Sequence, residues 1–102
     1  MSLVNINSVR SQVLRLLKRI EPPGGIELLS YKRNRSVAIA CLHDGGYLVR
    51  EKGYEEQEIS LTRDQLGKAL KTMIKREFPR SRKVRLFKFQ DPAELDRPRQ
   101  KI

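Results

Sequence analysis

The chain has 102 residues, which is enough for one small domain and leaves no room for a second. Its 22 basic and 12 acidic residues give a net charge of +10, which favours phosphate polymers, anionic lipid or acidic protein as partners. With one cysteine, Cys41, and one histidine, His43, it lacks the ligands of an ordinary zinc site, so we predict no metal and no cofactor.

The N-terminal segment MSLVNINSVR has neither the long apolar core nor the cleavage pattern of a signal peptide. No apolar run in the chain approaches the length needed to cross a bilayer. We therefore expect a cytoplasmic protein.

A helix is the first predicted element. Asn7 or Ser8 can cap it, and apolar residues at helical spacing continue to about Ile20, where EPPGG ends the helix. A basic amphipathic helix can lie on an anionic membrane, but this one is short and has no aromatic anchor, so we expect no membrane partner. Its cations, with no acid before Glu21, are Arg10, Arg15, Lys18 and Arg19.

Three strands are predicted next, near residues 26–32, 36–42 and 46–52. The turns between them are KRNRS, in which an asparagine tolerates left-handed backbone, and HDGG, with the Asp-Gly pair of tight hairpins. The middle segment, SVAIACL, is continuously apolar or small, which indicates a strand at the centre of the sheet. Alternation in EEQEISL predicts a fourth strand whose acids face water.

A second helix is predicted from Thr62 to about residue 78. Thr62 and Gln65 match a capping box, an apolar stripe follows, and Pro79 ends the helix. The composition of RKVRLFKF predicts a last strand, and we expect residues 90–102 to form a loosely ordered polar tail.

The element order α-β-β-β-(β)-α-β predicts an α+β fold, a single domain over residues 1–89. Both helices should pack on one face of a mostly antiparallel sheet and leave the other face open. The order of helix, three strands and helix is similar to that of double-stranded RNA-binding domains, and a strand meander before a long helix is similar to single-stranded DNA-binding coactivator domains. The lysine-rich start of the second helix in the first family is absent from LTRDQLGKALK, and no residue-level motif identifies a family.

The stretch KREFPRSRKVRLFKF, residues 75–89, holds seven cations and one acid, or +6 of the total charge of +10. In a strand, Lys83, Arg85, Phe87 and Phe89 share one face, so cations would alternate with aromatic rings. Such a face suits nucleic acid, because the cations neutralise phosphates and the rings stack on unpaired bases. The other interpretation is structural: cations favour a helix C-terminus and protect an edge strand, and the phenylalanines belong to the core.

A third basic cluster, Lys32, Arg33 and Arg35, is expected at a hairpin tip, where it is either a binding group or a soluble turn. Cys41 and His43, two residues apart, would share a face like a nucleophile and its base. No third group or oxyanion donor accompanies them, so we predict no enzyme.

We therefore predict a non-enzymatic module that binds nucleic acid, DNA or RNA, with little sequence preference. The predicted phosphate contacts are Arg80, Arg82, Lys83, Arg85 and Lys88, with Arg15, Arg19, Arg33 and Arg35 as outlying contacts, and the predicted stacking residues are Phe87 and Phe89.

The alternative is a protein-interaction or self-assembly module. Its open sheet face or last strand would pair with an acidic protein or a second copy in a homodimer. The candidate hot spots are Phe87, Phe89, Tyr47 and Tyr54.

Overall fold

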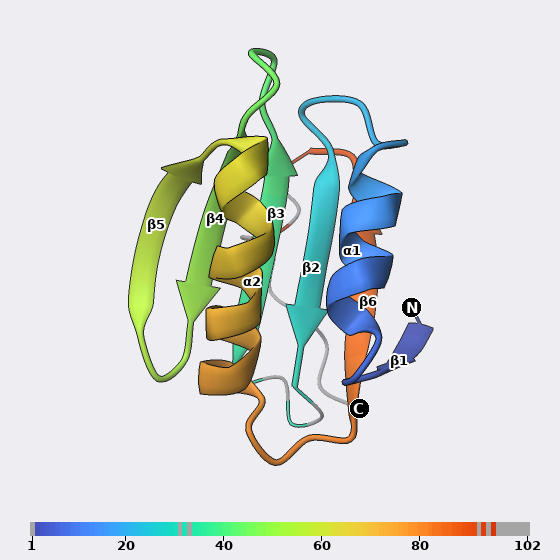
Figure 1. Ribbon diagram of the computed structural model, residues 1–102, viewed down its shortest axis with the longest axis vertical. Helices are drawn as coiled ribbons and strands as arrows, with labels where there is room; N and C mark the ends of the chain where they lie inside the picture. The colour runs from blue at the N-terminus through green and yellow to red at the C-terminus, as the bar shows by residue number, and fades with distance from the viewer. Residues whose placement is uncertain (1, 31, 33, 92, 94, 96–102) are drawn as a thin grey trace.

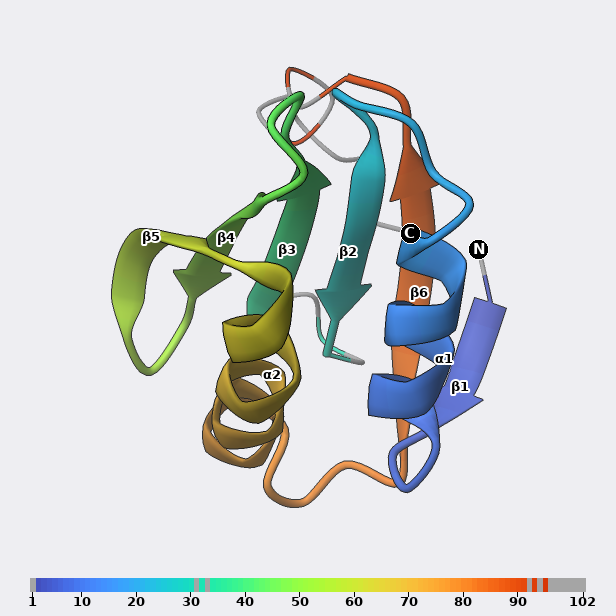
Figure 2. The same cartoon turned by 45° about the horizontal axis from the view of Figure 1, so that its top comes forward.

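The structure is a computed structural model, and it describes residues 2–30, 32, 34–91, 93 and 95. It confirms the α+β prediction: six antiparallel strands form one sheet, and two helices lie against the same face of it (Figure 1; Figure 2). The strand order is β1-β6-β2-β3-β4-β5. The elements in chain order are β1 (Ser2–Asn5), α1 (Val9–Leu17), β2 (Gly25–Leu29), β3 (Ser36–Cys41), β4 (Tyr47–Lys52), β5 (Glu56–Leu61), α2 (Arg63–Glu77) and β6 (Lys83–Phe89).

The core lies between the helices and the sheet. The helices bury Val13, Leu66 and Leu70 against alternate residues of the central strands, such as Ile39 of β3. As predicted, SVAIACL lies in the middle of the sheet. Its first six residues form β3, which pairs with β2 and β4, and all six are buried. A strand with one face exposed to water would alternate apolar and polar residues, and would not be apolar or small throughout.

The second helix begins as its sequence predicts. Gln65 turns back and its Oε1 accepts the Thr62 N–H at 3.0 Å, which satisfies one of the free donors at the helix start. The fourth predicted strand, β5, is also present, with its acids Glu56 and Glu58 exposed.

Strand β1 has no counterpart among the predicted elements. It pairs antiparallel with β6 over Ser2 to Asn5, and β2 pairs with the other side of β6. Within the last strand, only Arg85 and Leu86 pair on both sides, so the protection of a free edge does not explain the cation at Arg85. The two edges of the sheet are β1 and β5.

The prediction of an open second sheet face is wrong at its centre. Glu27, Leu29, Ala38 and Phe89 point away from the helix layer, yet each is at most 6% exposed. Small residues contribute to this burial, because Ala38 lies opposite the longer Arg50 on β4 and Gly25 lies opposite Phe89 on β6.

Most of the predicted tail, residues 92, 94 and 96–102, lies outside the described residues. Among the residues that the structure describes, no helix is long and apolar enough to cross a membrane.

Candidate functional site

The predicted site residues on β6 do not form one surface. Val84 and Leu86 point into the core, so Lys83, Arg85 and the two phenylalanines point to the opposite face of the sheet. Phe89 is only 6% exposed, which leaves its ring inaccessible to a base, whereas Phe87 is half-buried. Lys88 is exposed on the side of the helices.

The remaining predicted contacts are distributed over three other regions. Arg80 and Arg82 are exposed in the segment between α2 and β6, and Arg15 and Arg19 are exposed in or just beyond α1. Arg33 lies outside the described residues. The structure therefore does not bring all the predicted contacts onto one surface.

The two residues considered for catalysis, Cys41 and His43, have different environments. Cys41 is buried in the core, where burial raises the pKa of its thiol, while His43 is exposed in the turn beyond β3. They do not form a nucleophile and base. Of the two candidate tyrosine hot spots, Tyr47 is buried in the core as well, whereas Tyr54 is 71% exposed.

The helices carry the larger basic surface. Within residues 8–19 and 62–78, all of which the structure describes, Asp64 is the one exposed acid, because Glu77 is buried. We call the exposed cations of these segments the basic helix surface; they are Arg10, Arg15, Lys18, Arg19, Arg63, Lys68, Lys71 and Lys75.

Close packing brings the two helices together. Gly67 of α2 faces α1, and a β-carbon built on it would lie 3.7 Å from Leu14 Cδ1. One α-helical turn further along α2, Lys71 lies beside a hollow that Arg10 lines from the first turn of α1. No local sequence pattern signals this neighbourhood, since the positions are far apart in the chain.

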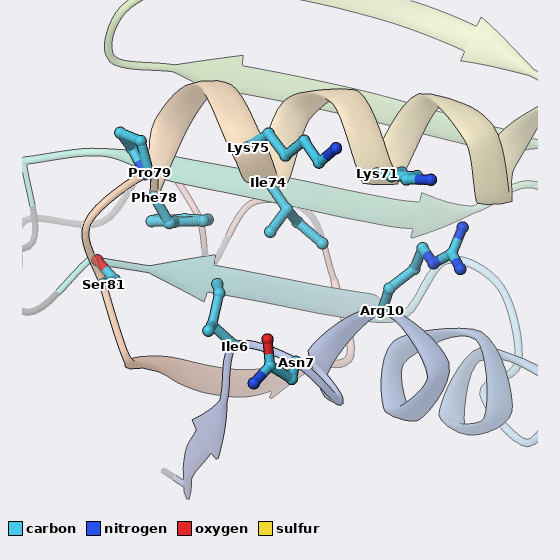
Figure 3. A pocket seen from close by; sticks show the side chains of 9 residues that line it. All are labelled: Ile6, Asn7, Arg10, Lys71, Ile74, Lys75, Phe78, Pro79 and Ser81. Atoms are coloured by element: carbon cyan, nitrogen blue, oxygen red, sulfur yellow. The ribbon is translucent and has the colours of Figure 1, made fainter.

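The hollow, which we call the basic groove, has a volume of about 580 Å³. It lies between the start of α1 and the last turns of α2 (Figure 3). Its cations are Arg10, Lys71 and Lys75, and its apolar wall includes Ile74, Phe78 and Pro79. Among the described residues, no acid lines it.

A second hollow, of about 460 Å³, adjoins the basic groove. Pro79 and Ser81 line both, and the cations of the second are Lys32, Arg35 and Arg80. The second hollow therefore joins the hairpin tip to the segment after α2, and the buried acid Glu77 lines it too. Arg35 also has a structural role, because its Nη1 donates to the Glu77 carbonyl oxygen at 3.4 Å.

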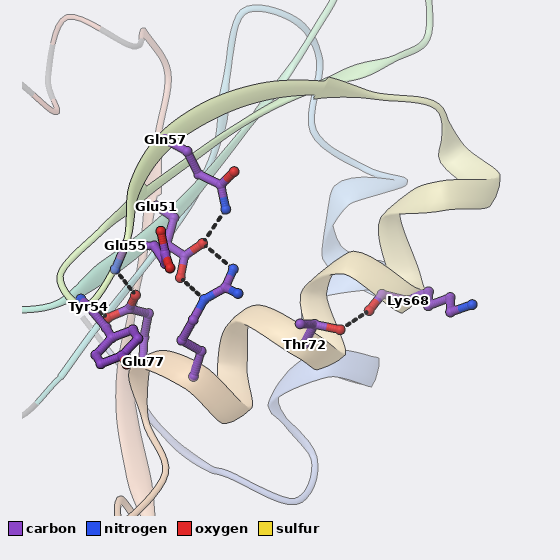
Figure 4. A network of polar contacts seen from close by, with 8 residues as sticks. Glu51, Tyr54, Glu55, Gln57, Lys68, Thr72 and Glu77 are labelled. Atoms are coloured by element: carbon purple, nitrogen blue, oxygen red, sulfur yellow. Dashed lines mark hydrogen bonds and ion pairs between the residues drawn. The ribbon is translucent and has the colours of Figure 1, made fainter.

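A network of buried acids fixes the end of α2 that forms the groove (Figure 4). Glu51 of β4 is fully buried and accepts two hydrogen bonds from Arg76, at 2.8 and 2.7 Å, and one from Gln57 at 2.8 Å. Arg76 therefore neutralises a core acid and does not belong to the free positive charge of residues 75–89.

The same network holds the turn between β4 and β5. The Glu77 carboxylate accepts the Tyr54 N–H at 2.8 Å and the Glu55 N–H at 3.1 Å. Burial and a hydrogen bond with Glu51 raise the pKa of Glu77. Burial alone would raise the pKa of Glu51 too, but hydrogen bonds from Arg76, Glu77 and Gln57 outweigh it and lower that pKa to about 2.

Comparison with known proteins adds no assignment: no protein-family model, no characterised protein and no solved structure gives a significant match to the chain. Among the described residues, no cluster of three or more histidine, cysteine, aspartate or glutamate side chains is arranged to hold a metal ion.

Proposed function

We propose that this protein is a small, non-enzymatic, cytoplasmic module that binds nucleic acid with little sequence preference through the basic helix surface. The observation that carries the proposal is the gathering of eight exposed cations with one exposed acid on two packed helices. A field of one sign attracts a phosphate polymer, and binding releases the counterions of that polymer.

The distribution of acids supports this orientation. Glu55, Glu56 and Glu58 are exposed at or near β5, which lies on the other side of α2 from α1 (Figure 1). A polyanion approaching the helices therefore meets the positive side of the molecule, whereas near β5 it would meet Glu55 and Glu56, with Glu58 already paired with Arg50. Arg80 and Lys32, beside the groove, would extend the contact toward the hairpin.

Titration of fluorescent single-stranded and double-stranded oligonucleotides across a range of salt concentrations tests the proposal. We expect log K to fall linearly with log salt, with a slope of roughly −0.7 to −0.9 per phosphate contact. Absence of binding at low salt, or binding that does not change with salt, would reject it.

A second candidate function is self-assembly through β1. This short strand lies at an edge of the sheet, and its Leu3 is 55% exposed. Unpaired backbone groups and an apolar side chain on an edge can recruit another strand. Sedimentation of the wild type and of Leu3→Lys tests this candidate, which requires a dimer that the substitution dissociates.

A further inference from the structure

The basic groove has two chemically different ends. In Figure 3 the side-chain nitrogens of Arg10 and Lys71 lie at one end, and Phe78 and Pro79 lie at the other. Ile74 and Lys75 lie between them. A ligand that fills the groove therefore needs an anionic group with an apolar part next to it.

Charge in the groove points to an anion. Within the described part of the chain, no side chain forms an ion pair or hydrogen bond with the side chains of Arg10, Lys71 or Lys75. Lys71 and Lys75 are also i, i+4 neighbours, and like charges at this spacing destabilise a helix. A bound anion would relieve this repulsion. Glu51 of the buried network does not relieve it, because Glu51 is already paired with Arg76.

Duplex nucleic acid satisfies only half of this description. Its phosphates suit the cations, but its bases are stacked inside and leave the apolar wall of the groove uncovered. An unpaired nucleotide carries a phosphate and, next to it, a base with two free π-faces. The groove volume of about 580 Å³ is within the range of small-ligand sites.

We infer that the basic groove binds one unpaired nucleotide of a single strand, with its phosphate at Arg10, Lys71 and Lys75. Its base lies against Ile6 and Pro79, the accessible part of the apolar wall, because Phe78 is only 2% exposed. This inference rests on the proposed function and adds to it a preference for single strands. The remaining cations of the basic helix surface then contact neighbouring phosphates.

A titration of the wild-type protein followed by NMR amide shifts tests the groove directly. The probes are adenosine monophosphate, ribose 5-phosphate and inorganic phosphate. We expect shifts at Ile6, Ile74 and Phe78, and an affinity for the mononucleotide about fivefold or more above that for ribose 5-phosphate, because the base buries apolar surface against the groove wall. Equal affinities for all three probes, or shifts located elsewhere, would overturn the inference.

Matched double variants test the groove in the context of a longer strand. Arg10→Gln with Lys71→Gln removes two groove cations, and Arg15→Gln with Lys68→Gln removes one arginine and one lysine from the same two helices outside the groove. All four residues are exposed, so the variants should fold, and circular dichroism verifies this. Both pairs should weaken duplex binding equally, but the groove pair should weaken single-strand binding about tenfold more.

The groove and the wider basic surface can be rejected separately. Equal effects of both pairs on single strands, with salt-dependent binding retained, would reject the groove and leave the proposed function standing. No binding of any oligonucleotide would reject the proposed function. Competition by a glutamate-rich peptide as strong as that by an oligonucleotide of equal charge would make an acidic protein the partner and would also overturn the inference.

Discussion

Two buried acids hold the end of α2 through hydrogen bonds. Glu51 and Glu77 are 0% and 2% exposed, and each has hydrogen-bond donors around it. The pKa of Glu51 is lowered to about 2, so folding keeps its carboxylate ionised. Its contribution to stability is complete above the unfolded pKa and is lost as the pH falls toward 2. The pKa of Glu77 is raised, so its pH dependence has the opposite sign: the contribution of Glu77 to the stability of the fold is present at low pH and is lost as the pH rises.

Glu51→Gln is expected to lower the free energy of unfolding at pH 7 by about 2 kcal/mol, because hydrogen bonds to a buried charge are removed. The difference from wild type should shrink as the pH falls from about 4.5 toward 2, where wild-type Glu51 becomes protonated. Urea denaturation at several pH values measures this. Glu58→Gln, which alters an exposed pair with Arg50, is the control and should have little effect. A difference that stays constant with pH would contradict the assignment.

Gly53 is required by its backbone and by its neighbour. Its φ is +152°, and a β-carbon there would collide with the Glu77 carboxylate. Gly45 has φ +89° but nothing within 4 Å of the same position. Gly53→Ala should therefore destabilise the protein more than Gly45→Ala, which should cost about 1 kcal/mol for backbone conformation alone. Thermal denaturation of both variants compares them, and equal decreases in stability would show that the contact with Glu77 has no cost.

At the scale of elements, Gly67 provides a stabilising substitution. It lies inside α2, where glycine costs about 0.5 to 1 kcal/mol relative to alanine. A β-carbon would meet Leu14 Cδ1 at 3.7 Å, an ordinary van der Waals contact. We expect Gly67→Ala to raise the melting temperature and to leave nucleotide binding unchanged. A lower melting temperature would mean that the helices must approach each other more closely than alanine allows.

Elements with a local signal were predictable from the sequence. α2 has a capping pair at Thr62 and Gln65, an apolar stripe and Pro79 at its end, and each of these acts within a few residues. β1 has no such signal, because the four residues SLVN become a strand only by pairing with β6 at the other end of the chain. Pairing between distant segments cannot be derived from local pattern.

The candidate site was predictable only in part for the same reason. The run of cations near residue 80 is visible in the sequence, but a count along the chain includes Arg76, which is paired with a buried acid. It also omits Lys71, which lies beside Arg10 only because α1 and α2 pack together. The sequence therefore showed where cations are frequent, but not which of them fold onto one surface.

At the scale of the whole molecule, folding separates charge into a basic helix surface and an acidic edge at β5. Most of the β6 cations lie on the face of the sheet opposite the helices, so the effect of removing cations can be compared between the two faces of the same protein. The helices carry more exposed cations than the β6 face, which is why we propose the helices as the place where a phosphate polymer binds.

The salt dependence of oligonucleotide binding by two double-lysine variants tests this preference most directly. One variant is Lys18→Gln with Lys68→Gln on the helices, and the other is Lys52→Gln with Lys83→Gln on the opposite side of the sheet; all four residues are exposed. We predict that the helix pair lowers the slope of log K against log salt by roughly 0.7 to 0.9 for each phosphate that is no longer neutralised, and that the sheet pair leaves the slope unchanged. A slope reduced by the sheet pair and unaffected by the helix pair would contradict binding through the helices.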